Sequence, residues 1–272
     1  MEIADNWSPQ QAARLDEFNA LRSVDIHCHC LPGLDDGPKS VEDAVALCAA
    51  LVADGITTVV ATPHQLGRYD PANSADDVRS AVDLLNAELK DREMPLEVLT
   101  GGDVRVDERI PRFIESGRLA TVADAGRHLL LELPHELFID PISSIGSLRA
   151  SGIQAVVTHP ERYAYLHDLQ DFATKCLEHG AVLQITSGSL LGDFGRRAYD
   201  EAWRLVLSGM VGLVASDAHD IKRRPPRMTA AIAVLKQTVG PALTRVLTIE
   251  NPLRIVNGEF IQPRNSGQRG DA

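Results

Sequence analysis

Short apolar runs rich in β-branched residues alternate along the chain with longer segments of helical periodicity. Seven runs are each short enough for one buried strand: residues 24–26, 57–61, 96–99, 129–131, 154–157, 182–185 and 211–215. Helical patterns lie between them, at about 40–55, 74–89, 108–116, 141–150, 168–179 and 197–208, and another follows the seventh run at about 226–238. Asn251-Pro252 is typical of an N-cap followed by proline at the first position of a final helix. This alternation predicts an α/β fold with a parallel sheet.

Side chains of metal-binding types stand at or just beyond the C-terminal ends of six runs. They are His27, His29, His64, Asp103, Glu132, His159, Asp217 and His219, and only the sixth run lacks such a residue. Six strand ends contribute to one site only when they encircle a common axis, whereas an open doubly wound sheet gathers ligands at its switch point. We therefore expect a closed or nearly closed TIM-like barrel of seven strand–helix units, with the open sheet as the alternative.

Both ends of the chain are expected to lie outside this barrel. Residues 9–22 predict an extra N-terminal helix, with Leu15, Phe18 and Leu21 on one side, that caps the barrel or forms a contact in a homo-oligomer. The polar tail, 263–272, is expected to be disordered. No linker divides the region between them, so residues 23–262 are predicted to form one domain.

Composition narrows the compartment and the partners. Four cysteines without CxxC spacing favour a reducing compartment. The N-terminus has no basic region, and no run of about 18 apolar residues occurs, so we expect a soluble cytoplasmic protein without membrane insertion. The net charge of −11 argues against nucleic acid as a partner. Bound cations reverse the local electrostatic potential, however, so the net charge does not exclude a small anionic substrate.

Two pairs of ligand-type residues are spaced by one residue. Strand alternation places His27 and His29 on one face of the first strand and Cys28 and Cys30 on the other. An isolated H-x-H is also found as ordinary core or surface histidines. Asp217-Ala218-His219 repeats the spacing after the seventh run, and this second pair favours a metal site.

Asp36, in a glycine-flanked turn after the first strand, is a ninth candidate ligand. The alternative is an ordinary solvent-exposed aspartate of a turn. Nine ligands are too many for one ion, which takes about four to six, so two or three metal ions are implied, joined by a bridging carboxylate. Imidazole with carboxylate suits manganese, iron or zinc. Clustered ions supply a hydroxide nucleophile near neutral pH, and hydrolysis is the natural reaction class.

Two arginines in the loops after strands indicate a phosphate substrate. Arg162 lies three residues beyond His159, and Arg224 lies five beyond His219. A guanidinium fork matches phosphate oxygens bidentately; a surface salt bridge is the alternative. Lys222 and Arg223 are weaker candidates.

Several motifs together carry a family resemblance. They are Asp25-Ile26-His27-Cys28-His29, Asp35-Asp36-Gly37-Pro38, Thr62-Pro63-His64, His159-Pro160-Glu161-Arg162 and Asp217-Ala218-His219. The chain resembles the polymerase-and-histidinol-phosphatase (PHP) superfamily and, from about residue 24 to 257, the bacterial tyrosine-protein phosphatases of the CpsB/CapC type.

The resemblance implies a distorted seven-stranded barrel, a trinuclear site usually associated with manganese, and dephosphorylation of tyrosine on an autophosphorylating kinase of capsule or exopolysaccharide synthesis. It implies that all the candidate ligands except Asp103 match the ligand positions of the family, and that Arg162 and Arg224 bind substrate. At Asp103 the family usually has glutamate, so the carboxylate is one methylene shorter. A metal-bound hydroxide would attack phosphorus without a protein nucleophile. In agreement, no cysteine is followed by arginine at the spacing of a cysteine-dependent phosphatase.

Two other functions stay open, and a third, amide hydrolysis, is disfavoured. Another PHP phosphoesterase, acting on histidinol phosphate or a second small monoester, would share the ligands. Amidohydrolases also begin with H-x-H, but they commonly use a lysine after the fourth strand and a histidine after the sixth, where this chain has Glu132 and Thr186-Ser187. A metal-dependent binding protein that docks a kinase tail is a non-enzymatic alternative.

Overall fold

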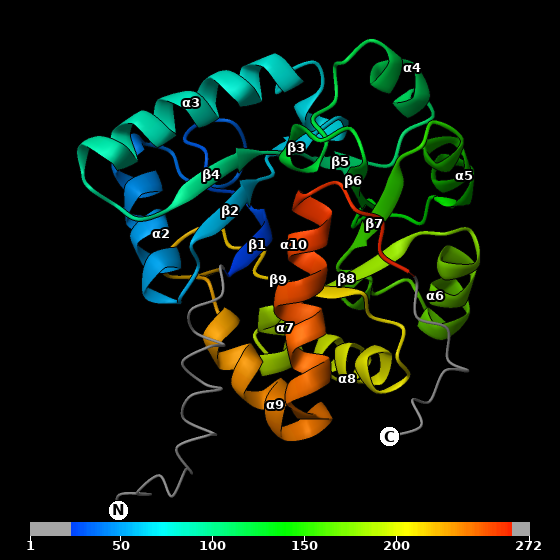
Figure 1. Cartoon of the computed structure of the whole chain (residues 1–272). Coiled ribbons are helices and arrows are strands. Elements are labelled where there is room, and N and C mark those ends of the chain that lie inside the picture. Colours follow the sequence, from blue (N-terminus) through cyan, green and yellow to red (C-terminus); the bar gives the residue numbers. More distant parts are fainter. Residues whose placement is uncertain (1–22, 263–272) are drawn as a thin grey trace, which may run out of the picture.

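Nine parallel strands form the centre of the protein, shown as a computed structural model in Figure 1; the structure describes residues 23–262. One sheet has the order β1-β2-β4, and the other has the order β3-β5-β6-β7-β8-β9. The strands are β1 Val24–Cys28, β2 Thr58–Ala61, β3 His64–Gln65, β4 Glu97–Thr100, β5 Asp103–Arg105, β6 His128–Glu132, β7 Gln154–Thr158, β8 Val182–Thr186 and β9 Leu213–Ala215.

Each of the seven predicted runs is a strand, so the α/β class and the parallel pairing are confirmed. The two additional strands, β3 and β5, continue β2 and β4 beyond a break. Pro63 cannot donate a ladder hydrogen bond, which interrupts the first of these strands. Gly101 and Gly102 interrupt the second, and an added Cβ at Gly101 would lie 2.5 Å from Cγ1 of Val60. Closure into a barrel stays a prediction.

Helices connect the strands (Figure 1). Their bounds are α2 Val41–Ala53, α3 Ala75–Asp91, α4 Ile110–Glu115, α5 Ile142–Ala150, α6 Leu169–Glu178, α7 Ser187–Leu191, α8 Gly195–Leu207, α9 Met228–Arg245 and α10 Asn251–Val256. Ser40 and Ser74 cap the first two, because each hydroxyl accepts a hydrogen bond from the backbone N–H three residues later. All seven helices predicted between residues 40 and 238 are present. The short α7 was not predicted.

The predicted start of the last helix is wrong in detail. Asn251 is helical, and it follows a π-helical turn, Val246–Glu250, that is continuous with α9. Its side chain donates a 2.6 Å hydrogen bond to the carbonyl of Gly212 instead of capping. The predicted helix at 9–22 and the tail at 263–272 lie outside the described residues.

The core has two layers. A large outer cluster packs strands against the surrounding helices and includes Cys28, Cys30 and Cys48, as expected for small packing residues. An inner cluster takes side chains from strands of both sheets and from α10: Val24, Ile26, Val60, Val122, Leu130, Val156, Val182, Leu213, Ala215, Ile255 and Ile261. Strands of both sheets and α10 therefore share one apolar cluster.

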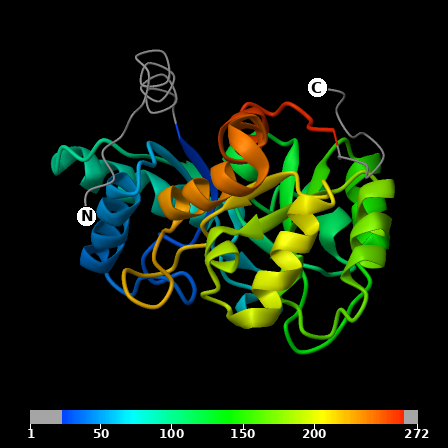
Figure 2. The same ribbon diagram turned by 90° about the horizontal axis from the view of Figure 1, so that it is seen from below.

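The loops at the carboxyl ends of the strands lie opposite α10. In Figure 2, α10 is near the upper edge, and the loops after β1 (blue) and β9 (orange) are at the lower edge. The first and last strands meet there: the N–H of Asp217 donates to the carbonyl of His27, and the N–H of His29 donates to the carbonyl of Ala218, both at 2.8 Å. Among residues 23–262, no helix has the length and apolar character needed to span a membrane.

The break between β4 and β5 gives a stability prediction. Gly101→Ala is expected to lower the free energy of unfolding by about 1–3 kcal/mol, because the methyl group would overlap the buried Val60 side chain. Gly146→Ala in α5, where nothing lies within 4 Å of the added Cβ, is expected to raise it by about 0.5–1 kcal/mol. Urea unfolding measures both, and equal stabilities of the two variants would contradict the prediction.

Candidate metal centre

All nine candidate ligands converge at the carboxyl ends of the strands. Their ligand atoms form four overlapping groups, and within each group the atoms lie within 4.8 Å of one another. The groups are His29, Asp36, His64 and His219; His27, His29 and Asp217; His27, Asp103 and His159; and His64, Asp103 and Glu132. The structure therefore brings together all nine candidate ligands.

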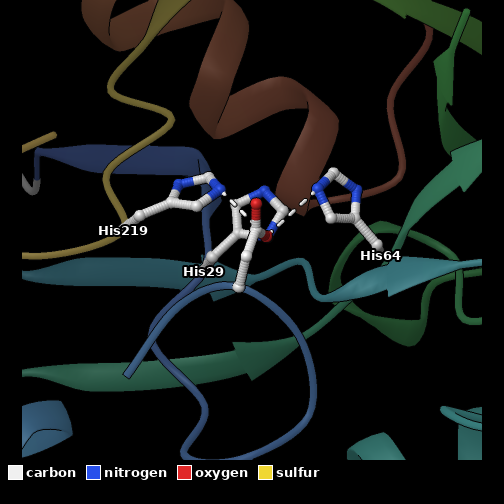
Figure 3. A group of neighbouring side chains, drawn as sticks. His29, His64 and His219 are labelled. Atoms are coloured by element: carbon white, nitrogen blue, oxygen red, sulfur yellow. Dashed lines mark ion pairs between the residues drawn. The ribbon is translucent and has the colours of Figure 1, made fainter. Parts of the chain in front are cut away.

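The outermost group surrounds the carboxylate of Asp36. Its Oδ1 lies 3.4 Å from Nε2 of His64 and 3.5 Å from Nε2 of His219. Figure 3 shows these two rings on either side of His29. The Asp36 side chain is 42% exposed, whereas His29 is buried, so this group faces the opening.

Two of the three deeper groups share the carboxylate of Asp103. Its Oδ2 lies 3.3 Å from Nδ1 of His64 and 3.7 Å from Nε2 of His27, and Oε2 of Glu132 is 3.5 Å from the same Nδ1 of His64. An aspartate at this position thus reaches side chains of both groups despite its short side chain.

Several buried polar atoms in the cluster fit a cation. Nδ1 of His64, Oδ2 of Asp103 and Nδ1 of His159 have no hydrogen-bond partner within residues 23–262, and buried polar atoms rarely stay unpaired. Burial and the charge of Asp103 raise the pKa of Glu132 to about 7. Burial, with His29 nearby, lowers the pKa of His219 to about 4, which leaves that imidazole neutral and able to ligate at neutral pH.

Neighbouring groups orient three of the histidines. Nδ1 of His27 is 2.8 Å from Oε1 of Gln184, and Nδ1 of His29 is 2.5 Å from Oδ2 of Asp35. Nδ1 of His219 is 3.0 Å from the carbonyl of Asp217. Each contact favours a proton on Nδ1 and an unprotonated Nε2, the usual support of a metal-bound histidine. Nε2 of His219 here accepts a 2.8 Å hydrogen bond from Arg224.

Two turns of the site have unusual backbone geometry. His159 has φ of 36° and Asp217 has φ of 53°, in the left-handed region that non-glycine residues seldom occupy. The Asp217 turn is held by Asp25, whose carboxylate accepts hydrogen bonds from the N–H and the hydroxyl of Ser216. Glu161 holds the other turn through the N–H of Thr186. Such backbone strain concentrates at functional sites.

Arg162 and Arg224 meet at one oxygen. Both donate to Oδ2 of Asp217, while Oδ1 of that residue faces Nε2 of His27 at 3.3 Å. The ring of Phe194 lies under both guanidinium groups, at 4.2 Å from Cζ of Arg162 and 5.9 Å from Cζ of Arg224. The neighbouring Arg223 is exposed and does not line the cavity over the cluster, but it lines a small adjacent pocket with Phe194 and Asp217.

A cavity of about 500 Å³ opens over the cluster. Its lining combines candidate ligands with cationic side chains: Asp36, His64, Arg68, Arg105, Glu132, His135, Glu136, His159, Arg162, Asp217 and Arg224. Arg105 donates a 3.0 Å hydrogen bond from Nε to Glu132. The cavity can therefore accept an anion against the histidine–carboxylate cluster.

Sequence reasoning missed the residues that support the ligands. Asp35 adjoins Asp36, and only the structure shows that Asp35 supports His29 whereas Asp36 faces the opening. Gln184 lies within the sixth run, which lacks a ligand at its end; a polar residue inside a buried strand was the signal available. No linear pattern pointed to Phe194.

A parallel α/β protein with a histidine–carboxylate cluster at its strand ends belongs to the class of metal-dependent hydrolases. The model of the family described as "Capsular polysaccharide synthesis, CpsB/CapC" matches residues 23–257. The tyrosine-protein phosphatase YwqE of Bacillus subtilis (strain 168) is 35% identical over 250 residues, which cover 88% of this chain and 94% of YwqE. This chain therefore belongs to the CpsB/CapC family.

Two further comparisons agree. The tyrosine-protein phosphatase CpsB of Streptococcus pneumoniae is 26% identical over 246 residues, which cover 88% of this chain and 100% of CpsB. A solved structure from work on YwqE and CpsB, described as unique metal-dependent tyrosine phosphatases, superposes with a TM-score of 0.84 at 33% identity. It covers 89% of this chain and 97% of its own.

The contact between His27 and Gln184 gives a second prediction. Gln184→Leu removes the acceptor that holds the proton on Nδ1 of His27, and metal affinity is expected to fall about 10- to 100-fold. Gln184→Glu, which keeps an oxygen acceptor, is expected to retain the metal. Metal content after dialysis against a weak chelator measures both effects. Equal retention by the wild type and the leucine variant would show that Gln184 has no such role.

Proposed function

We propose that this chain is a metal-dependent protein-tyrosine phosphatase. The observation that carries the proposal is the convergence of nine histidine and carboxylate side chains with two arginines at one cavity. Relatives that match nearly the whole chain are tyrosine-protein phosphatases, and the superposed structure comes from work on metal-dependent ones. A metal cluster facing an arginine pair suits a phosphate monoester.

The strands are proposed to enclose a distorted (β/α)7 barrel. With β2–β3 and β4–β5 each taken as one bent strand, there are seven strands. Closure is supported by the inner apolar cluster, which draws on both sheets, and by the bridge between Cys28 and Ala218. In a barrel, the loops at the carboxyl ends of the strands surround one site.

The nine converging side chains are proposed to hold two or three divalent ions. Manganese is the favoured metal, with iron and zinc as alternatives for an imidazole and carboxylate donor set. Asp103 is the proposed bridging ligand because, of the four carboxylates, it alone belongs to two of the groups. When bound, such ions supply a nucleophile from water at neutral pH and neutralise charge on a phosphoryl group.

The arginine pair is the chain's own contribution to substrate binding. Arg162 and Arg224 present two planar forks that match the oxygens of a phosphate, and Phe194 keeps both at one wall of the cavity. Because they already contact Asp217, they hold the phosphate close to the ligand cluster. Their role is to orient the phosphate for in-line displacement and to stabilise its charge.

The proposed substrate is a phosphotyrosine protein, in particular the tail of an autophosphorylating tyrosine kinase of capsule or exopolysaccharide synthesis. The family description, capsular polysaccharide synthesis, supports this context. We place the reaction in the cytoplasm. The net charge of −11 argues against nucleic acid as a substrate.

The arginine pair gives a third prediction. Arg224→Ala is expected to lower kcat/KM on a phosphotyrosine peptide by about 10²- to 10³-fold, because a charged donor to the transferring group is lost. Arg254→Ala is the matched control: it removes an exposed arginine on α10, at the opposite end of the protein from the cavity, and should change kcat/KM less than about twofold. Steady-state phosphate release measures both, and similar losses in the two variants would refute the assignment.

The choice of substrate is tested on protein loaded with manganese. Initial rates are compared for a phosphotyrosine peptide, a phosphoserine peptide and histidinol phosphate. The phosphotyrosine peptide is expected to react fastest, and a strong chelator should abolish turnover until divalent metal is restored. Preference for histidinol phosphate would favour a small-molecule phosphoesterase, and binding without turnover of any substrate would favour a docking protein. Fewer than about two ions per chain would contradict the proposed cluster.

A further inference from the structure

One loop beside the cavity exposes three consecutive large apolar side chains. Leu137 is 56% exposed, Phe138 is 49% exposed and Ile139 is 40% exposed, in the segment between β6 and α5. The two preceding residues, His135 and Glu136, line the cavity. A single loop thus forms part of the cavity wall and then continues as an apolar rim, 137–139.

A row of rings fixes this rim to the site. His135 stacks on His159 at 5.8 Å and lies 5.1 Å from Tyr163; Tyr163 stacks on Tyr165 at 5.6 Å, and Phe138 lies 6.0 Å from Tyr165. The rings therefore form a continuous path from a candidate ligand to the exposed surface.

The row is also held at its outer end. Phe138 meets Phe172 edge to face at 6.2 Å, and the hydroxyl of Tyr165 donates a 2.6 Å hydrogen bond to the carbonyl of Pro134. The chain has 6 Phe and 4 Tyr residues, and two of each gather here. An exposed ring that is already ordered loses little conformational entropy when a partner binds, so it suits recognition.

We propose that the rim 137–139 binds an apolar side chain of the substrate polypeptide next to its phosphotyrosine, and so determines peptide specificity. This inference rests on the proposed phosphatase function. Ile139 follows Glu136 by three residues, at most about 10 Å of chain, and an extended substrate spans that distance in about three residues. The recognised side chain therefore lies within about three residues of the phosphotyrosine. Partial burial of two or three apolar groups suits a modest selectivity rather than tight binding.

The rim is tested with a peptide series and a small substrate. A polar host peptide carries one phosphotyrosine, and either leucine or serine is placed at each position from three before it to three after it. The wild type is expected to show a kcat/KM about fivefold to tenfold higher for leucine than for serine at one or more positions. p-Nitrophenyl phosphate has no flanking residues, so its kcat/KM measures phosphate hydrolysis without a contribution from peptide contacts to the rim.

Phe138→Ser and Leu137→Ser are each expected to remove most of the leucine preference and to change kcat/KM on p-nitrophenyl phosphate less than about twofold. The more exposed Leu137 keeps the test informative if loss of Phe138 disturbs the loop. Leu84→Ser is the matched control, because Leu84 is 74% exposed on α3, which contributes no residue to the cavity lining. That variant should keep the preference.

Three results would overturn the rim proposal while leaving the proposed function intact: no leucine preference in the wild type, a preference that survives in both rim variants, or parallel losses on peptides and p-nitrophenyl phosphate. Absence of wild-type activity on every phosphotyrosine peptide would overturn both proposals.

Discussion

The candidate site depends on the contact between the first strand and the segment after the last strand. The carboxylate of Asp25 accepts hydrogen bonds from the backbone N–H and the hydroxyl of Ser216, and the N–H of Asp217 donates to the carbonyl of His27. These residues are about 190 positions apart, so ordering them costs considerable chain entropy. The outer and inner apolar clusters meet that cost, since both take side chains from β1 and β9 or from the segment next to it. Without this contact, the paired residues at the two ends of the domain would not share a site.

The buried carboxylates of the site differ in how far neighbouring positive charge compensates them. The deep carboxylates of Asp103 and Glu132 lie near histidines and Arg105, and the pKa of Glu132 is still raised to about 7. Asp217 differs: burial opposes its ionisation, but Arg224, His27 and Arg162 hold its pKa well below the usual range. Within the inner part of the cluster, the charge of Glu132 is therefore not fully compensated, whereas His27 and His64 lower the pKa of Asp103 against its burial. The arginines already compensate Asp217.

Strand positions and ligand types could be read from the sequence because buried parallel strands are apolar runs and functional side chains follow them. The breaks at Pro63 and Gly101-Gly102 were visible as residues, but the bend that pairs His64 with Asp103 was not. The support from Gln184 joins positions 157 residues apart, and no local pattern encodes such a pairing. Asp35 supports His29 whereas Asp36 faces the opening, and this difference depends on the geometry of the turn, which two adjacent identical residues do not reveal.

The two oxygens of Asp217 face different partners: Oδ1 faces His27 and His29, and Oδ2 faces the two arginines. An anion that draws the guanidinium groups toward itself leaves more of the carboxylate's charge to be shared with a cation held by those histidines. Thermodynamic linkage makes such an effect reciprocal. With the proposed cation bound, anion and cation would strengthen each other's binding through this one side chain.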